Sequence, residues 1–400
     1  MKELRKVAII GCGMGGMVCA SHIDNTGNKV VIYERHDEPG KKLLITGNGH
    51  CNITNENIEP KYYYSKSPGR LMALMKDFTY EKSVSMWKKL GLMLKSRDGY
   101  VYPVSDEASS VVNVLLARLE ELGVEIRYNT PVNSIDISGT GFLVNGEYYD
   151  KVVIATGGMA GIYRENEING YAMLRRLDVK CNYCYPALTK AVCENPNFKI
   201  ISGVRCDVNI KLCNEGIIDE EEGQLQITDN GLSGIPVFQL SRYIGELIDK
   251  GAKPYFEVDF LKYTSGDELA AYVDKAYDSR NIESLKLANG LMHSKLALFM
   301  LAIAGINPYD RINNIDKHTM LNALLSMKNY RFNITKLANF KSAQISSGGV
   351  SLNEINDSFE CVRYPGMYII GEALDCAGKC GGYNLHFATQ SGYKAAADIG

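Results

Sequence analysis

Two short apolar runs, separated by a glycine-rich turn, open the chain. Residues 6–10 (Lys-Val-Ala-Ile-Ile) and 30–33 (Val-Val-Ile-Tyr) have the nearly continuous apolar character of strands buried in a parallel sheet. The first run leads directly into Gly11-Cys-Gly-Met-Gly-Gly16, and a helix is expected to begin near Gly13. Glu34 stands at the tip of the second run. This order predicts alternating strands and helices at the start of the chain.

The same alternation continues beyond the first two strands. Helical periodicity covers residues 68–78, 81–90 and 107–122, and short strands are predicted at 124–127, 132–137, 142–144 and 147–149. A further buried strand, residues 151–155, runs into Thr156-Gly-Gly158. Near the end of the chain, residues 366–371 repeat this pattern, and a closing helix follows from about Tyr383. Strands typical of a parallel sheet therefore lie at both ends of the chain.

The middle of the chain has a different pattern. Short alternating segments at 204–210 and 225–228 indicate an antiparallel unit, whereas Leu and Ala recur at helical spacing over 285–303 and 321–327. The predicted fold is α/β. It has a discontinuous Rossmann-like domain (1–186 and 347–400), an inserted β-rich, small barrel-like substrate domain (187–262 and 330–346) and a helical subdomain (263–329).

The glycine turn has the spacing of a dinucleotide-binding site. Gly11 permits the tight turn, Gly13 lets the backbone approach a pyrophosphate, and Gly16 allows the helix to pack closely on the strand. The start of the helix directs N–H groups and a positive dipole end at the phosphates. Glu34 follows about 20 residues later, where a carboxylate accepts hydrogen bonds from ribose hydroxyls. The sequence therefore predicts that the chain binds a dinucleotide.

Composition narrows the class of protein. The formal net charge is −2, so no overall attraction to nucleic acid or to an anionic membrane is expected. The polar start of the chain does not resemble a signal peptide, and the longest apolar stretch, 296–306, is about half a membrane span. Eleven cysteines in such a chain indicate reduced thiols and a cytoplasmic protein that does not enter a membrane.

Two cysteine pairs have spacings that occur in functional sites. Cys181 and Cys184 have the spacing of a redox pair or of half a zinc site, but no second such pair completes a metal shell, so no metal is predicted. Cys376 and Cys380 lie in a glycine-rich loop, and no role is assigned to them.

Three further segments identify a family. Residues 40–52 (GKKLLITGNGHCN), 344–355 (QISSGGVSLNEI) and 371–385 (GEALDCAGKCGGYNL) closely resemble the aminoacetone-oxidase-like, bile-acid C=C reductase-like FAD-binding flavoproteins. This family also contains a ribosomal-RNA dihydrouridine synthase. The resemblance covers nearly the whole chain. It implies that the Rossmann-like domain binds FAD and that the chain is an FAD-dependent oxidoreductase.

The resemblance also implies which residues contact FAD. From the first glycine turn and second strand these are Gly11, Gly13, Met14, Gly15, Gly16, Glu34 and Arg35. The next loop supplies Lys41, Lys42, Leu43, Asn48, Gly49, Cys51 and Asn52, and the middle of the domain supplies Val132, Ala155, Thr156 and Gly157. The last motif supplies Gly371, Glu372, Asp375, Gly381, Gly382, Tyr383, Asn384 and Leu385.

Four residues are candidates for moving a proton near the flavin. They are His50, Tyr100, Tyr102 and His386, all in segments that the family places around the ring. Each has a purely structural alternative: His50 as a loop contact, the tyrosines as interface packing and His386 as helix packing. His50 and His386 replace an Arg and a Gln usual in the family, and Tyr100 follows Gly99 where the family usually has Arg. Because of these departures, the sequence does not identify the substrate.

The leading functional hypothesis is reduction of a conjugated C=C bond in a small apolar substrate. Hydride would come from flavin N5, and NAD(P)H would act as a transient electron donor, because no second glycine fingerprint for a stable nicotinamide site follows a strand. The alternatives are amine oxidation with O2, dihydrouridine formation in ribosomal RNA, and FAD binding without catalysis. The RNA alternative needs a basic surface, and the net charge argues against it. The sequence makes no prediction of oligomeric state.

Overall fold

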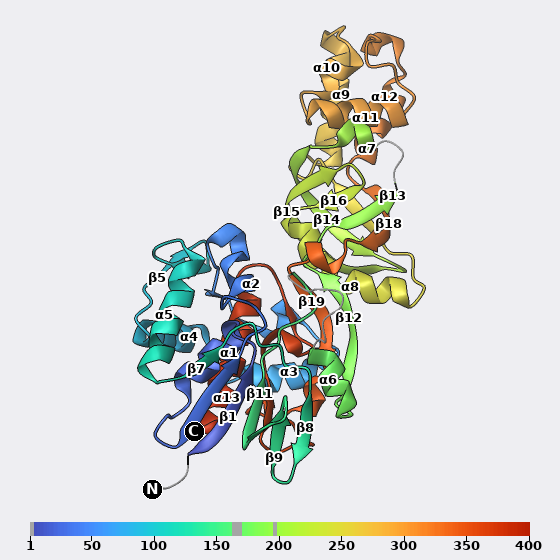
Figure 1. Cartoon of the computed structure of the whole chain (residues 1–400). Coiled ribbons are helices and arrows are strands. Elements are labelled where there is room, and N and C mark those ends of the chain that lie inside the picture. The colour runs from blue at the N-terminus through green and yellow to red at the C-terminus, as the bar shows by residue number, and fades with distance from the viewer. Residues whose placement is uncertain (1–3, 162–169, 195–197) are drawn as a thin grey trace. The chain divides into compact units, whose positions relative to one another are not determined.

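The chain forms two compact units in the computed structural model, which describes residues 4–161, 170–194 and 198–400 (Figure 1). The first unit contains Met1–Tyr185 and Gln344–Gly400, and the second contains Pro186–Ala343. The barrel and the helices predicted as an insertion both fall in the second unit, whereas residues 344–346, also predicted there, lie in the first.

A five-stranded parallel sheet organises the first unit. Its order is β20 (Met367–Ile369), β11 (Lys151–Ile154), β1 (Arg5–Ile10), β2 (Asn28–Tyr33) and β7 (Glu125–Arg127). Every neighbouring pair is parallel. Because β20 comes from the end of the chain and pairs with β11, both ends of the sequence build one sheet. This confirms the discontinuous Rossmann-like arrangement.

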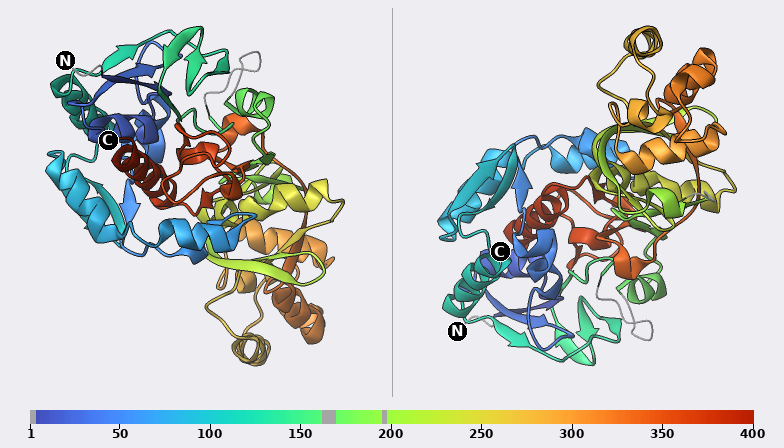
Figure 2. Two further views of the ribbon diagram at one scale, coloured as in Figure 1. Left: turned by 90° about the horizontal axis from the view of Figure 1, so that it is seen from below. Right: turned by 90° about the horizontal axis from the view of Figure 1, so that it is seen from above.

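Helices from both ends of the chain also pack together. α1 (Met14–His22) lies against α13 (Tyr383–Ile399), and a Cβ added at Gly392 would lie 2.5 Å from the carbonyl oxygen of Gly15. This contact brings the two backbones close together, which glycine permits. The other helices of this unit are α2 (Lys41–Leu44), α3 (Pro68–Met75), α4 (Tyr80–Lys89), α5 (Ala108–Glu121) and α6 (Gly170–Arg176). Figure 2 shows α13 beside the sheet from two further sides.

Shorter sheets flank the parallel sheet. β3 (Thr54–Asn55), β6 (Tyr100–Pro103) and β5 (Leu94–Arg97) form one antiparallel sheet, and β8 (Ile135–Ser138), β9 (Gly141–Val144) and β10 (Glu147–Tyr149) form another. Two pairs complete the unit, β4 (Tyr63–Tyr64) with β21 (Ala377–Gly378) and β12 (Cys181–Ala187) with β19 (Ile345–Val350). The sheet of β3, β6 and β5 was not predicted.

A closed antiparallel barrel forms the centre of the second unit. Its strands are β13 (Ala191–Glu194), β16 (Gly231–Ser233), β15 (Ile217–Thr228), β14 (Arg205–Cys213), β17 (Tyr255–Asp259) and β18 (Tyr330–Leu337). The side chains of Ile210, Phe256 and Phe332 are completely buried in its core. The barrel confirms the β-rich part of the predicted fold.

Helices pack against this barrel or gather at one end of it (Figure 1). They are α7 (Phe198–Ile201), α8 (Ile235–Asp249) and, at that end, α9 (Gly266–Ser279), α10 (Ser284–Ala288), α11 (Ser294–Ile303) and α12 (Lys317–Ser326). α8 contradicts the prediction of antiparallel strands for this part of residues 187–262. Val237, Leu240 and Ile244 are buried at helical spacing, and Pro236 lies in the first turn, where proline is tolerated. No helix within the described ranges is long and apolar enough to cross a membrane.

Candidate flavin-binding site

The turns that follow the parallel strands meet at one edge of the sheet. The N–H group of Gly11 donates to the Tyr33 carbonyl over 2.8 Å, and that of Ala155 donates to the Ile10 carbonyl over 2.9 Å. Gly11 has φ +109°, and a Cβ there would overlap the Ala155 carbonyl. A Cβ at Gly16 would overlap the Gly11 carbonyl. Both glycines are therefore required by the turn itself.

Gly13 differs from these two glycines because no described residue occupies the space beside it. A Cβ at Gly13 would meet no atom of residues 4–161, 170–194 or 198–400 within 4 Å. Gly13 is also the N-cap of α1, and having no side chain it cannot cap the N–H groups of the first turn, Met14, Gly15 and Gly16. An open approach to uncapped N–H groups at a helix start suits a pyrophosphate.

Glu34 lies at the same edge and is almost completely buried. Its Oε2 accepts the N–H of Cys12 at 2.8 Å, and its Oε1 accepts the N–H of His36 at 2.9 Å. Each carboxylate oxygen keeps capacity for a second hydrogen bond, which suits a ribose hydroxyl. The Glu34 carbonyl accepts the N–H of Thr130 at 2.8 Å, which brings the segment leading to the buried Val132 alongside. Arg35, the next residue, is half-buried. These groups fit the adenosine half of FAD.

The loop after β2 is joined to the last motif of the chain. The Lys42 ammonium lies 2.5 Å from Oε2 of Glu372, whose Oε1 accepts the Ser346 N–H at 3.0 Å. Lys41 pairs with Asp37 at 2.6 Å, and Leu43 is buried. Asn48 and Gly49 have positive φ values of 55° and 90°. The loop is thus shaped by its backbone and by an ion pair to Glu372.

Cys51 and Asn52 end this loop in different environments. The thiol of Cys51 is fully buried, and burial raises its pKa to about 12, so it remains protonated at neutral pH. The side-chain oxygen of Asn52 is buried, with no hydrogen-bond partner among the described residues, and it faces Gly382. A buried acceptor of this kind suits a donor on a bound ligand.

The remaining middle and late residues divide into open and packed positions. Gly157 has φ +70°, and a Cβ there would meet no atom of the described residues within 4 Å, whereas the Thr156 side chain packs against Gly170. Gly371, with φ +68°, donates its N–H to the Ser391 hydroxyl at 2.9 Å. The side chain of Asn384 closes the turn before it. Its oxygen accepts the Gly378 N–H at 2.8 Å, and its nitrogen donates to the Gly378 carbonyl at 3.0 Å.

Asp375 is engaged within the protein. It is completely buried, and its Oδ2 accepts the Lys66 N–H at 3.0 Å and the Asn182 side-chain amide at 2.8 Å. These bonds join three segments that are distant in sequence. These bonds give Oδ2 of Asp375 a structural role, and the predicted contact of Asp375 with FAD stays a prediction.

The start of α13 contacts the small sheet formed by β3 and β6. The Asn55 amide donates to the Gly381 carbonyl at 3.0 Å, and a Cβ at Gly381 would lie 2.5 Å from the Tyr100 ring. The Tyr383 ring is buried, with the Tyr63 hydroxyl donating to the Tyr383 carbonyl at 3.1 Å, and Leu385 is half-buried. Thr54 and Asn55 were not predicted at this turn, because a two-residue strand has no recognisable periodicity.

Tyr100 and Tyr102 lie on the same face of β6, two residues apart. Tyr100 is 38% exposed, whereas Tyr102 is half-buried with the Arg97 guanidinium 5.9 Å from the centre of its ring. Burial, together with the neighbouring Tyr100, raises the pKa of Tyr102, which keeps its hydroxyl protonated at neutral pH. Tyr100 thus lies beside the Gly381–Gly382 turn, and Tyr102 lies two residues further along the same strand.

The two candidate histidines lie in opposite environments. His50 is exposed, and its Nδ1 lies 2.9 Å from the backbone carbonyl of Asp106. His386 is completely buried; its Nδ1 bonds the Thr54 hydroxyl at 2.8 Å and its Nε2 the Phe78 carbonyl at 3.2 Å. Burial lowers the pKa of His386 to about 4. With both ring nitrogens engaged, His386 is not presented to a substrate, and the geometry favours its packing alternative.

The side chains of Cys181 and Cys184 do not point the same way. Residues three apart on a strand point to opposite faces, and burial raises the pKa of both thiols to about 11. Within the ranges that the structure describes, no three His, Cys, Asp or Glu side chains are grouped to hold a metal. All eleven cysteines are free thiols.

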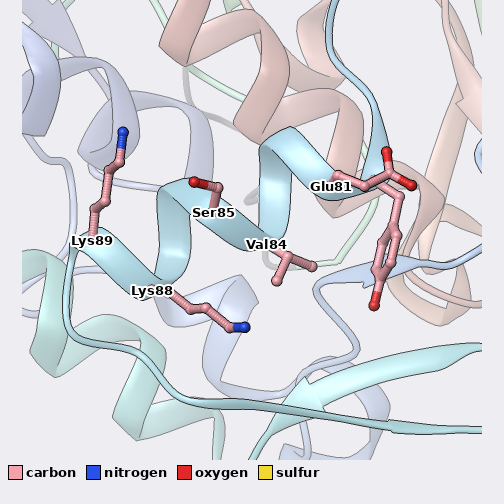
Figure 3. A pocket seen from close by; sticks show the side chains of 6 residues that line it. Glu81, Val84, Ser85, Lys88 and Lys89 are labelled. Carbon is pink, nitrogen blue, oxygen red and sulfur yellow. The ribbon is translucent and has the colours of Figure 1, made fainter.

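A surface depression along α4 is separate from these residues. Figure 3 shows it lined by Tyr80, Glu81, Val84, Ser85, Lys88 and Lys89. All six belong to one helix, and none is a predicted site residue. This depression is the flank of an exposed helix, and it offers no converging polar groups.

Comparison with known proteins identifies the family. Residues 5–398 match the model of the HI0933-like protein Rossmann domain. The chain is 32% identical to a 3-dehydro-bile acid delta(4,6)-reductase of Clostridium scindens, over 98% of both chains. It is 26% identical to the ribosomal RNA dihydrouridine synthase of Escherichia coli, over 98% of this chain and 97% of that one.

Solved structures of other enzymes have lower sequence identity to this chain than these two relatives. A 3-ketosteroid delta1-dehydrogenase of Sterolibacterium denitrificans is 14% identical over 99% of both chains, with a TM-score of 0.49. The family match spans the parallel sheet, the barrel and the predicted flavin-contacting turns. The chain therefore belongs to the HI0933-like family, and it is an FAD-dependent oxidoreductase.

Proposed function

We propose that this enzyme reduces a C=C bond conjugated to a carbonyl group in a small, apolar molecule. The names of two of its relatives describe one reaction class, since a delta(4,6)-reductase saturates ring double bonds and dihydrouridine is uridine with its ring C=C bond saturated. Bound FAD supplies the hydride in such a reaction. The protein then needs to orient the alkene and to deliver one proton.

Tyr100 is the residue that we propose as the proton donor. Its ring packs on Gly381, at the start of the helix whose first residues the family resemblance implies contact FAD, and 38% of its surface is exposed. Tyr102, on the same face of β6, keeps a protonated hydroxyl at neutral pH. The single observation that carries the proposal is this half-exposed phenol at the Gly381–Gly382 turn.

We further propose that NAD(P)H delivers electrons by docking transiently. The sequence contains one glycine fingerprint after a strand, and Gly13 and Glu34 fit it to the adenosine half of FAD. A second dinucleotide would then bind without a Rossmann turn of its own. Anaerobic mixing of the yellow enzyme with NADH or NADPH tests this, since loss of flavin absorbance is expected with at least one of them.

Anaerobic turnover tests the main proposal. The purified holoenzyme would be given NAD(P)H with a 3-oxo-4,6-diene bile acid or a simple cyclic enone in separate anaerobic reactions, and a primary amine without NAD(P)H in a parallel aerobic reaction. Saturation of the diene or enone is expected. Oxidation of the amine with O2 and no reduction of either alkene would overturn the proposal in favour of an amine oxidase.

Substitution of the proposed donor sharpens this test. Tyr100→Phe removes the hydroxyl but keeps the ring on Gly381, so kcat is expected to fall by roughly 100-fold with unchanged flavin absorbance. Tyr102→Phe is the matched control and is expected to change kcat by less than about threefold. Equal losses in both variants would assign the effect to the packing of β6.

Ribosomal RNA is the second candidate substrate, because a dihydrouridine synthase aligns with nearly the whole chain. RNA binding depends on contacts between cationic side chains and phosphates, and the net charge of −2 disfavours it. Mass spectrometry of ribosomal RNA from cells with and without the gene distinguishes the two. A position that carries dihydrouridine in the parent strain and unmodified uridine in the deletion strain would favour RNA as the substrate.

A further inference from the structure

A closed circuit of contacts joins His386 to the turn at the start of α13. The backbone N–H of His386 donates to the Gly382 carbonyl at 2.8 Å. The imidazole of the same residue lies 2.8 Å from the Thr54 hydroxyl. The carbonyl of Thr54 in turn faces Gly382 so closely that a Cβ on Gly382 would overlap it. The first of these contacts is the ordinary backbone bond of the helix start, so the side chain of His386 acts on Gly382 through Thr54.

The partners of His386 determine the tautomer of its ring. The Phe78 carbonyl can only accept a hydrogen bond, so Nε2 carries the proton that it receives. Nδ1 is then an acceptor, and the Thr54 hydroxyl donates to it. Thr54, Phe78 and His386 are all completely buried, so water cannot replace a lost partner without rearrangement.

The same short strand, β3, also contacts Gly381 and lies beside Tyr100, the proposed proton donor. Asn55, next to Thr54, donates its amide to the Gly381 carbonyl at 3.0 Å. β3 pairs with β6, where Asn55 lies opposite Tyr100. A displacement of Thr54 would therefore move Gly381, Gly382 and Tyr100 together.

From this circuit we infer that His386 is a positioning residue of the flavin site. It holds the Gly381–Gly382 turn against β3 and so sets the direction of the first N–H groups of α13, without touching a substrate. The inference concerns the cofactor alone, and it holds whichever substrate the enzyme reduces.

Affinity for FAD in the full-length apoprotein tests the inference. His386→Leu keeps a side chain in the buried space but removes both hydrogen bonds, and FAD binding is expected to weaken by roughly 10- to 100-fold, with a shifted visible flavin spectrum. His386→Gln offers one acceptor and one donor, so its affinity should stay within about threefold of the parent. Thr54→Val keeps the β-branched shape without the hydroxyl and should resemble His386→Leu.

Gln390, one turn further along α13, provides the matched control. It is equally buried, and its amide donates to the Leu74 carbonyl at 2.5 Å without contact to β3 in the described hydrogen bonds. Gln390→Met should lower the melting temperature of the apoprotein but leave FAD affinity and the flavin spectrum unchanged.

Three outcomes test the positioning role of His386. Unchanged FAD affinity and spectrum in Thr54→Val would overturn the inference, and this variant serves even if His386→Leu does not fold. An equal loss of affinity in Gln390→Met would reduce the effect to general stability and would also overturn it. If the pattern of affinities holds but no alkene is reduced, the proposed function fails and the inference stands.

Discussion

At the scale of single residues, burial decides which candidate groups can exchange protons. Burial raises the pKa of the Cys12 and Cys51 thiols to about 12, although both lie within predicted FAD-binding segments. It lowers the pKa of His386 to about 4, which removes that imidazole from acid–base chemistry at neutral pH. Tyr100, with its partly open ring, is the candidate that combines exposure with a place at the α13 turn.

The neutral, buried His386 should make the protein sensitive to acid. Its folded-state pKa of about 4 lies below the usual 6.5, so the unfolded chain takes up a proton first as the pH falls. Its stability contribution is complete above about pH 6.5 and declines by about 3 kcal/mol as the pH falls to about 4. Urea unfolding at several pH values measures this slope. His386→Gln should show a shallower decline between these limits, and identical slopes would contradict the assignment.

Two glycines of the first turn should respond to alanine in opposite ways. Gly11→Ala introduces a Cβ that overlaps the Ala155 carbonyl at φ +109°, so the free energy of unfolding should fall by more than about 3 kcal/mol. The methyl group of Gly13→Ala meets no atom of the part of the chain that the structure describes within 4 Å, and φ is an ordinary −88°, so the fold should persist. The new methyl would instead obstruct the phosphate approach. Thermal melting and FAD titration together separate these effects, and full FAD affinity in Gly13→Ala would remove this position from the phosphate site.

At the scale of elements, the site depends on where strands end and helices begin. β1, β2, β11 and β20 are parallel, so the segments after them share one edge of the sheet. α1 and α13 both begin after glycines, and Gly382 caps α13 with φ +90°. Both helix starts thus present backbone N–H groups without a capping side chain from the N-cap residue.

Substitution of Gly382 should show how strongly α13 depends on β3. Gly382→Ala combines a positive φ with an overlap against the Thr54 carbonyl, whereas Gly91→Ala has the similar φ of +91° but open space. The Gly91 variant measures the backbone strain alone, about 1 kcal/mol. Gly382→Ala should cost at least about 2 kcal/mol more and abolish FAD binding. Equal unfolding free energies would mean that the contact with β3 relaxes freely.

At the scale of the whole molecule, the predicted cofactor residues all belong to one unit. Every residue proposed to contact FAD lies in Met1–Tyr185 or Gln344–Gly400, whereas the barrel and its helices have a separate core. Two cores in one chain can unfold separately. A ligand stabilises the part of the protein that it binds.

Calorimetry of the full chain should therefore resolve two unfolding transitions. FAD at 100 times its dissociation constant should stabilise only the first unit, by about 2.7 kcal/mol. Phe332→Ala, in the completely buried core of the barrel, should lower only the other transition. A single transition that shifts as a whole with FAD and with the Phe332 substitution would show that the units unfold together.

The strongly periodic parts of the sequence were sufficient to predict most of the first unit. The strands at 6–10, 30–33 and 151–155 and the helices at 68–78, 81–90 and 107–122 were recovered with small shifts at their ends. α8 was missed because its apolar residues also fit a short buried strand. β3 was missed because two residues are too few to show a period, yet Thr54 and Asn55 hold the turn at Gly381 and Gly382.

The sequence by itself determined the class of cofactor, because glycines at fixed spacing and an acid after the second strand have local physical requirements that few other structures share. It could not determine which candidate side chains remain accessible. Burial and hydrogen-bond partners are set by segments far apart in the chain, such as Thr54, Phe78 and His386. Tertiary structure alone therefore separated Tyr100, at the open side of the turn, from His386, inside the core that supports it.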